Sequence, residues 1–211
     1  MKYTLFLIFT FALLAACTST PVVTKKREDP NSFPAWQARH KQEVEQFLQY
    51  LAAQDVLKVL PPEHLLRSAS DWEKCNAEPF AVPPRQRWSD AVSVLRLLRY
   101  LQLTGVIGSV EVYSAYRNPS LNICAGGAEK SAHARSFALD FRVQGTVDPT
   151  DALCDFWRTQ GALWNMGYTR YPSGRIHIDT AGYRTWGIDP ASGSGACRRF
   201  WPNFDNLPGK G

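Results

Sequence analysis

Two short segments of the chain hold side chains that could together bind a metal ion. The first runs from Ser131 through His133 to Asp140, and the second contains His177 and Asp179. Two imidazoles and one carboxylate form a ligand set that zinc favours in hydrolytic sites, where a fourth position stays open for water. The chain has only four histidines, and half of them lie in these two segments. Convergence of His133, Asp140 and His177 would make the chain a metal hydrolase.

Hydrolysis at such a site also requires a group that accepts a proton from water, and a carboxylate is the usual choice. Asp179 follows His177 by two residues, so in a strand both side chains lie on the same face. We predict Asp179 as the general base, although it could equally orient His177 by binding its other ring nitrogen. Glu129 and Glu111 are weaker alternatives for the base.

Arg117 offers a second kind of chemistry, because a guanidinium suits bidentate capture of a carboxylate such as the free C-terminus of a peptide. It follows a stretch in which Val110, Val112 and Ser114 alternate with the residues between them, a pattern typical of a strand. Taken alone, an arginine at such a turn is more often a surface residue than a ligand-binding one.

Apolar spacings of three and four residues predict helices in the parts of the chain that surround these motifs. A shorter helical turn is expected to begin near Pro62. His40 and His64 lie within helical segments, which favours packed or solvated side chains over metal ligands. The three longer helices are expected at residues 35–54, 89–103 and 150–160.

Alternation of apolar and polar residues predicts further strands at 136–143, 168–171 and 175–180, the last two joined as a hairpin. Asp140 lies opposite an apolar row in the first of them, and His177 lies opposite two isoleucines in the last. N-terminal helices followed by mostly antiparallel strands predict an α+β fold. The helices would pack on one face of the sheet, and the other face would carry the polar site.

The N-terminus resembles a bacterial lipoprotein signal. Lys2 precedes an apolar run that ends in Leu-Ala-Ala-Cys17, similar to the lipobox whose cysteine becomes the lipidated first residue. Ordinary secretion with an incidental cysteine is the alternative. Lipidation at Cys17 would anchor the protein at the periplasmic face of the cell envelope, and Thr18 favours the outer membrane if the cell is Gram-negative.

This reading divides the chain into a signal peptide, a tether and one domain. The signal peptide spans 1–17, the flexible tether spans 18–33, and the domain spans 34–211. The domain consists of a helical part at about 34–107, a part with the candidate site at about 108–187, and an irregular tail at 188–211.

Four cysteines remain after Cys17. In an oxidising compartment they would form two disulfides, with three possible connectivities. Of these we favour Cys75–Cys124 together with Cys154–Cys197. Metal ligation by these cysteines is disfavoured, since none has C-x-x-C spacing.

Composition limits the classes of protein that the chain can represent. Its 211 residues suffice for one domain with a sizeable core, and 45% hydrophobic with 12% aromatic residues exclude a disordered chain. The net charge of +5 is mild, and no zinc-finger or RNA-binding signature is present, so no nucleic-acid partner is expected. The chain contains no internal repeat, and we expect a monomer.

Several motifs occur in order along the chain: S-A-Y-R-N-P at 114–119, S-x-H at 131–133, A-x-D at 138–140 and H-I-D at 177–179. In combination they resemble the zinc D-Ala-D-Ala carboxypeptidase family, which is grouped with lysostaphin-type peptidases and the hedgehog signalling domain. The resemblance covers about residues 88–187 and implies the fold of that superfamily.

The resemblance implies zinc bound by His133, Asp140 and His177, with the substrate positioned by Arg117 and with Ser114 nearby. It implies hydrolysis of bonds that contain D-amino acids in the stem peptides or cross-links of peptidoglycan, by a carboxypeptidase or an endopeptidase. A lipid-tethered periplasmic protein would reach that substrate directly. The alternative is a non-catalytic, zinc-containing lipoprotein that binds peptidoglycan or a protein.

The chain departs from the family at the position of the base. Some relatives have an acidic residue three positions before the last histidine, where this chain has Gly174, and others have a histidine where it has Arg175. Ala115 and Ser136 replace glycines of the family motifs. The resemblance therefore assigns no base, and Asp179 is predicted from its spacing alone.

Overall fold

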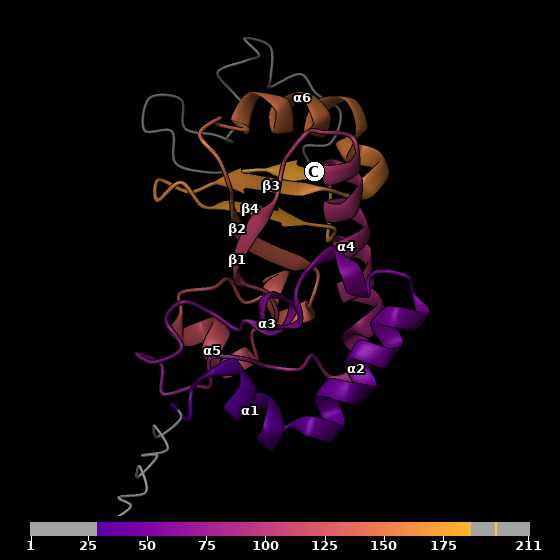
Figure 1. The fold of residues 1–211 in the computed structure, drawn as a ribbon. Helices are drawn as coiled ribbons and strands as arrows, with labels where there is room; N and C mark the ends of the chain where they lie inside the picture. Colours follow the sequence, from indigo (N-terminus) through magenta and orange to yellow (C-terminus); the bar gives the residue numbers. More distant parts are fainter. Residues whose placement is uncertain (1–28, 187–196, 198–211) are drawn as a thin grey trace, which may run out of the picture.

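The computed structural model describes residues 29–186 and residue 197, in which helices surround a five-stranded sheet (Figure 1). The α-helices are α1 (Phe33–Arg39), α2 (Lys41–Ala53), α3 (Pro62–Leu66), α4 (Trp88–Leu103), α5 (Pro119–Cys124) and α6 (Thr150–Gln160). The strands are β1 (Val110–Ser114), β2 (Ala138–Val143), β3 (Gly167–Arg170), β4 (Ile176–Asp179) and β5 (Arg184–Thr185). Within this described part, every helix is too short or too polar to cross a membrane.

The strands form one sheet in the order β1-β2-β4-β3-β5. The pairs β1–β2, β2–β4 and β3–β4 are antiparallel, and β5 pairs parallel with β3. This arrangement confirms the predicted α+β fold with a mostly antiparallel sheet. The short elements α5 and β5 were not predicted, because six and two residues carry too little periodicity to stand out.

The single helix predicted over 35–54 is wrong: α1 and α2 are separate helices that meet at His40. The backbone there leaves the helical region, with φ −110° and ψ 23°. The His40 ring stacks on Trp36 with 4.5 Å between centroids, and its Nε2 lies 3.2 Å from Glu78 Oε2. These contacts hold the bend, while the apolar stripe continues through buried Val44. Spacing alone therefore does not reveal the break.

The apolar core lies between one face of the sheet and the helices. Phe141 of β2 and Ile178 of β4 are fully buried together with Leu98 of α4 and Leu153 of α6. Both helices lie next to the sheet in Figure 1. Burying one such side chain stabilises the fold by about 1.5–3 kcal/mol relative to its exposure. This packing fixes the strands and leaves their other row for polar side chains.

A row of polar residues crosses the sheet where the candidate site lies. Ser114 pairs with Asp140, Asp140 with His177, and His177 with Thr169. Ser114 enters this row because the register shifts between Val112 and Ser114, as at a β-bulge. The sequence pattern predicts strict alternation, which would have left Ser114 on the same face as Val112; the register shift places it on the face of Asp140.

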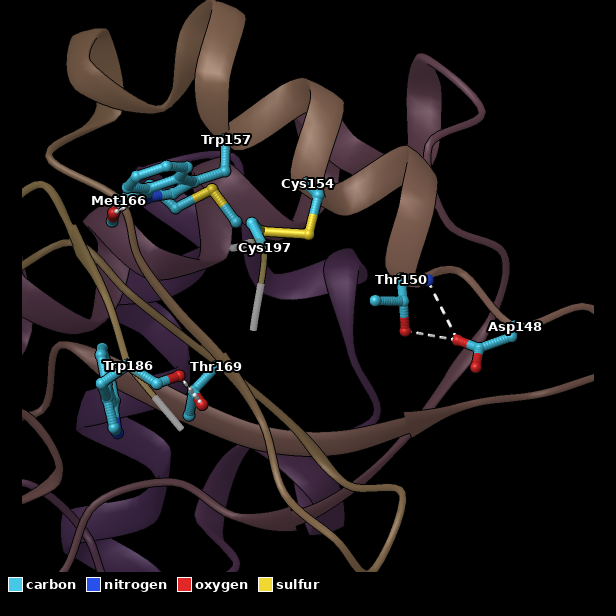
Figure 2. The surroundings of a disulfide bond; sticks show 8 residues. All are labelled: Asp148, Thr150, Cys154, Trp157, Met166, Thr169, Trp186 and Cys197. Atoms are coloured by element: carbon cyan, nitrogen blue, oxygen red, sulfur yellow. Dashed lines mark hydrogen bonds between the residues drawn. A yellow bond between two sulfur atoms is a disulfide. The ribbon is translucent and has the colours of Figure 1, made fainter. Parts of the chain in front are cut away.

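Two disulfides tie separate segments of the chain together. Cys75 bonds to Cys124 at the end of α5, and Cys154 of α6 bonds to Cys197, as Figure 2 shows for the second pair. These are the two pairings that we favoured among the three connectivities. The second disulfide attaches Cys197, which follows the last strand in sequence, to a core helix.

Several predictions concern residues outside the described part of the chain. The signal peptide 1–17 with its lipidation site Cys17 lies there, as does the tail 188–211 apart from Cys197. The tether 18–33 lies there up to residue 28, and α1 begins at its last residue, Phe33.

Candidate metal centre

Three buried side chains each direct one donor atom at a common point. His133 Nε2 lies 3.2 Å from His177 Nδ1 and 3.1 Å from Asp140 Oδ1, and those last two atoms are 2.8 Å apart. Ligands of a tetrahedral zinc, held about 2.0–2.1 Å from the ion, lie on the order of 3.3 Å from one another. The triangle therefore fits one such ion with small shifts. Within the described residues, this is the group of ligand-type side chains close enough to share an ion.

Two paired strands and a tight turn bring these residues together. Asp140 of β2 and His177 of β4 are direct cross-strand partners. His133 opens the 3₁₀ turn His133–Arg135, which ends at Ser136 in the left-handed conformation with φ 66°. This conformation costs a residue with a Cβ about 1–2 kcal/mol. The glycine that the family motif has at this position would adopt the conformation without that cost, whereas Ser136 adopts it with strain.

Hydrogen bonds on the outer nitrogen of each imidazole decide which nitrogen faces the centre. His133 Nδ1 donates to the backbone oxygen of Ala115 at 2.6 Å, because a carbonyl only accepts. His177 Nε2 likewise donates to Asp179 Oδ2 at 2.9 Å. In its neutral form, each ring therefore presents an unprotonated nitrogen beside Asp140. Three lone pairs facing one another repel unless a proton or a metal ion lies between them, so the donor set fits a metal.

The electrostatics of the centre favour a positive charge. Burial alone would raise the pKa of Asp140, but the two histidines beside it hold that pKa well below its usual range. Burial lowers the pKa of His133. Burial also opposes a charge on His177, yet hydrogen bonds to Asp140 and Asp179 outweigh it and raise the pKa of that imidazole. A positive charge beside Asp140 is thus stabilised, and a divalent ion in the donor triangle can replace the proton of His177.

The donor triangle opens into a cavity of about 660 Å³, a size typical of small-ligand sites. The predicted residues Arg117, His133, Asp140 and His177 all line it. The rest of its lining comes from most of loop 125–132, the β3–β4 hairpin and the segment around β5. Lining side chains to which the sequence reasoning gave no role are Lys130, Tyr171, Arg175, Arg184 and Trp186.

A family model described as Peptidase M15 matches residues 60–179, which is more than half of the chain. The chain belongs to the peptidase M15 family. The match contains His133, Asp140 and His177, and it begins well before the motifs, so α3 and α4 are part of the family domain. M15 peptidases are typically zinc-dependent, which makes the chain a metallopeptidase in general class. No curated protein and no solved structure matches the chain.

In this M15 chain, Asp179 lies on the far side of the His177 ring from the donor triangle. Its buried carboxylate accepts the His177 Nε2–H, the Ala181 N–H at 2.8 Å and both terminal nitrogens of Arg184, at 2.9 and 2.7 Å. A Cβ on Gly167 would lie 2.3 Å from Asp179 Oδ2, so the carboxylate is enclosed on that side as well. The prediction of Asp179 as general base does not fit this geometry. Its alternative role, the orientation of His177, does fit.

Arg117 lies at the edge of the centre, and Ser114 lies behind it. Arg117 Nη2 donates to Asp140 Oδ2 at 2.6 Å, and Arg117 Nε donates to Ser114 Oγ at 2.8 Å. Ser114 is buried and donates its hydroxyl to the backbone oxygen of Ser68. Ser114 therefore positions Arg117 and is not itself in reach of a ligand. Arg117 keeps Nη1 for a ligand, which suits one oxygen better than the bidentate capture that the sequence suggests.

Proposed function

We propose that this M15 chain is a zinc-dependent peptidase that hydrolyses D-amino-acid-containing peptide bonds of peptidoglycan, as a carboxypeptidase or a cross-link endopeptidase. One observation carries the proposal: the buried triangle of His133, Asp140 and His177 opens into a cavity whose charged lining is mostly basic. Such a cavity suits peptides with free carboxylates. The motif resemblance to D-Ala-D-Ala carboxypeptidases supports the substrate class.

The residues of the centre prepare it for the metal and for a carbonyl substrate. A zinc ion held by His133, Asp140 and His177 would polarise the scissile carbonyl and acidify a water. Hydrogen bonds on their outer nitrogens keep both imidazoles in the tautomer that can bind the ion. Arg117 holds Asp140 Oδ2 and so turns Oδ1 toward the imidazoles.

Two hydrogen-bond donors are available for the oxygen that gains negative charge during attack on the carbonyl. Arg117 contributes Nη1, which has no partner among the described residues. Burial, followed by the charge of Asp140, raises the pKa of Tyr171, so its hydroxyl stays protonated at neutral pH. Tyr171 lines the cavity and can donate from there. Loss of one such donor typically slows turnover about 100- to 1000-fold.

We propose a base other than Asp179, because the carboxylate of Asp179 lies beyond the His177 ring from the donor triangle. Asp140 is the one carboxylate in the described lining of the cavity, and it is committed to the centre. Glu111 accepts the Tyr113 hydroxyl at 2.7 Å and does not line the cavity. Glu129 is exposed in the loop between two lining residues, and we propose it as the base. Glu129→Gln should then suppress turnover and spare zinc binding, whereas unchanged turnover would remove Glu129 from this role.

Muropeptide digestion by the purified protein without its signal segment tests the proposed reaction. Loss of D-Ala from intact stem peptides indicates a carboxypeptidase, and conversion of cross-linked dimers to monomers indicates an endopeptidase. His133→Ala should lose both metal and activity, whereas His64→Ala on α3 changes a histidine outside the centre and should keep both. Absence of any change in either muropeptide would contradict the peptidase proposal.

A second candidate function is a non-catalytic lipoprotein that binds peptidoglycan or a protein through a zinc-containing groove. The observation that favours it is the scarcity of carboxylates in the described cavity lining, where Asp140 stands alone. Zinc bound in stoichiometric amount, together with muropeptides that bind but remain uncut, would support this function. Hydrolysis that depends on His133 would exclude it.

We also propose that Cys17 carries a lipid and anchors the domain at the periplasmic face of the envelope, on the outer membrane in a Gram-negative cell. The Leu-Ala-Ala-Cys17 sequence after an apolar run supports this location, where peptidoglycan stem peptides are accessible. Radiolabelled palmitate should be incorporated into the wild type and not into Cys17→Ala. Label that persists in Cys17→Ala would overturn lipidation at this residue.

A further inference from the structure

Arg175 occupies the place where two hollows of the surface meet. It lines the main cavity, and it also lines a second hollow of about 380 Å³ together with Trp72 and Tyr113. It stands two residues before His177, directly ahead of β4, and both residues line the main cavity. Two residues of strand span about 6–7 Å. Arg175 is therefore within reach of a peptide bound at the metal centre.

The arginines that line the main cavity differ in which guanidinium nitrogens remain free. Arg117 already uses Nε and Nη2, and Arg184 uses both terminal nitrogens for a buried carboxylate. Arg175 uses Nη1, which donates to Ser70 Oγ at 2.7 Å. Its Nε and Nη2 form one edge of the guanidinium and have no hydrogen-bond partner among the described residues. A carboxylate matches such an edge with two parallel hydrogen bonds.

The guanidinium of Arg175 is held in position but has no counter-ion among the described residues. Its Cζ lies 4.6 Å from the centroid of the Tyr113 ring, so the guanidinium packs against that ring. In the described part of the chain, no carboxylate forms an ion pair with it. Its Nε is buried and has no partner in the described ranges, which is unfavourable until a ligand accepts from it. Lys130, which also lines the cavity, offers a point charge without a fork.

We propose that Arg175 binds a carboxylate of the substrate through Nε and Nη2 and makes the site selective for acidic peptides. The carboxylate lies one or two residues from the cleaved bond, because an extended peptide spans about 3.3–3.6 Å per residue. It is either the C-terminal carboxylate or an acidic side chain. This inference rests on the proposed peptidase function and adds the substrate class to it.

Peptide binding to the metal-free and the zinc-loaded protein tests this inference without requiring turnover. The first probe is a stem peptide whose C-terminal carboxylate and acidic side chain are both free. The other two probes are the same peptide with the C-terminus amidated and with the side chain amidated. We expect one amide to bind the wild type about 10- to 100-fold more weakly than the free peptide, and the amide that does so identifies the carboxylate. Arg175→Gln should bind the free peptide as weakly as that amide and should not distinguish the two.

Two further variants keep the test decisive. Arg175→Lys retains the charge without the fork and should recover part of the lost affinity. Arg170→Gln removes the same charge from the neighbouring strand β3, where Arg170 pairs with Asp148 outside the cavity, and should bind as the wild type does. Circular dichroism of each variant verifies its fold.

The outcomes separate this inference from the proposed reaction. Equal discrimination by the wild type and Arg175→Gln would overturn the role of Arg175, and so would a wild type that binds all three peptides equally. If the protein cleaves peptides without discriminating between them, the role of Arg175 is contradicted and the peptidase function stands. If it discriminates between them yet cleaves none, carboxylate binding by Arg175 stands and the peptidase function is contradicted.

Discussion

Replacement of Asp179 by asparagine separates its two possible roles, because the change keeps the size of the side chain and alters its hydrogen bonding. Both carboxylate oxygens act as acceptors, for His177 Nε2, Arg184 and a backbone N–H. An amide nitrogen that faces His177 Nε2 would donate to it and move the ring proton to Nδ1. His177 would then present a proton, in place of a lone pair, toward Asp140 and His133. Metal binding should weaken as a result.

The structure places the expected loss at the upper end of the usual range. Removing the outer partner of a metal-binding histidine weakens metal affinity about 10- to 100-fold, which corresponds to about 1.4–2.8 kcal/mol. Asp179 is 0% exposed and His177 is 4% exposed, so water cannot supply the lost acceptor. We therefore expect zinc affinity to fall about 100-fold in Asp179→Asn.

Competition with a fluorescent chelator measures this affinity, and muropeptide digestion measures turnover on the same samples. We expect excess zinc to restore part of the turnover of Asp179→Asn. Asp71→Asn, which changes an exposed carboxylate paired with Lys74, should bind zinc as the wild type does. Unchanged zinc affinity combined with lost turnover would refute the positioning role and return Asp179 to the role of base.

Three other substitutions test the supports of the site and the fold. Gly167→Ala should weaken zinc binding and lower the melting temperature, since its Cβ would lie 2.3 Å from an oxygen of Asp179; wild-type values for both would contradict the enclosure. Cys154→Ala removes a disulfide between residues 43 apart and should lower the free energy of unfolding by about 2–4 kcal/mol, as measured in urea. Burial alone would raise the pKa of Glu78, but hydrogen bonds from Trp36 and His40 lower it below its usual value of 4.5. The ionised Glu78 therefore stabilises the fold above that value, and this contribution is lost as pH falls through the lowered pKa. Glu78→Gln should accordingly lose less stability in acid than the wild type.

Periodicity predicts the elements whose apolar pattern is regular along their whole length. The spacing predicts α6 with the bounds that it has in the structure, 150–160, and it predicts the β3–β4 hairpin. It fails where a local contact overrides the pattern. The bend at His40 depends on a ring stacked on Trp36 and on Glu78, which is distant in sequence, while apolar residues continue on both sides.

The motifs predict which side chains meet at the centre but do not assign the roles around it. His133, Asp140 and His177 meet because a turn and two paired strands carry them. The two-residue spacing correctly predicts that Asp179 shares a strand face with His177. Its role depends on which ring nitrogen faces the centre, and spacing contains no such information. Since Nδ1 faces inward, the ring itself stands between Asp179 and the donor triangle.

Strand register also decides which arginine is free to bind a carboxylate. A uniform two-residue period would place Ser114 on the same sheet face as Val112, but the register shift brings it opposite Asp140. There its hydroxyl oxygen accepts a hydrogen bond from Arg117 Nε. Arg117 Nη2 is bound to Asp140, so the edge that the sequence assigns to carboxylate capture is already engaged. The corresponding edge of Arg175 has no partner within residues 29–186, because Ser70 accepts only from its Nη1. Bidentate carboxylate binding, which the motif suggests for Arg117, therefore fits Arg175, the position at which some relatives have a histidine.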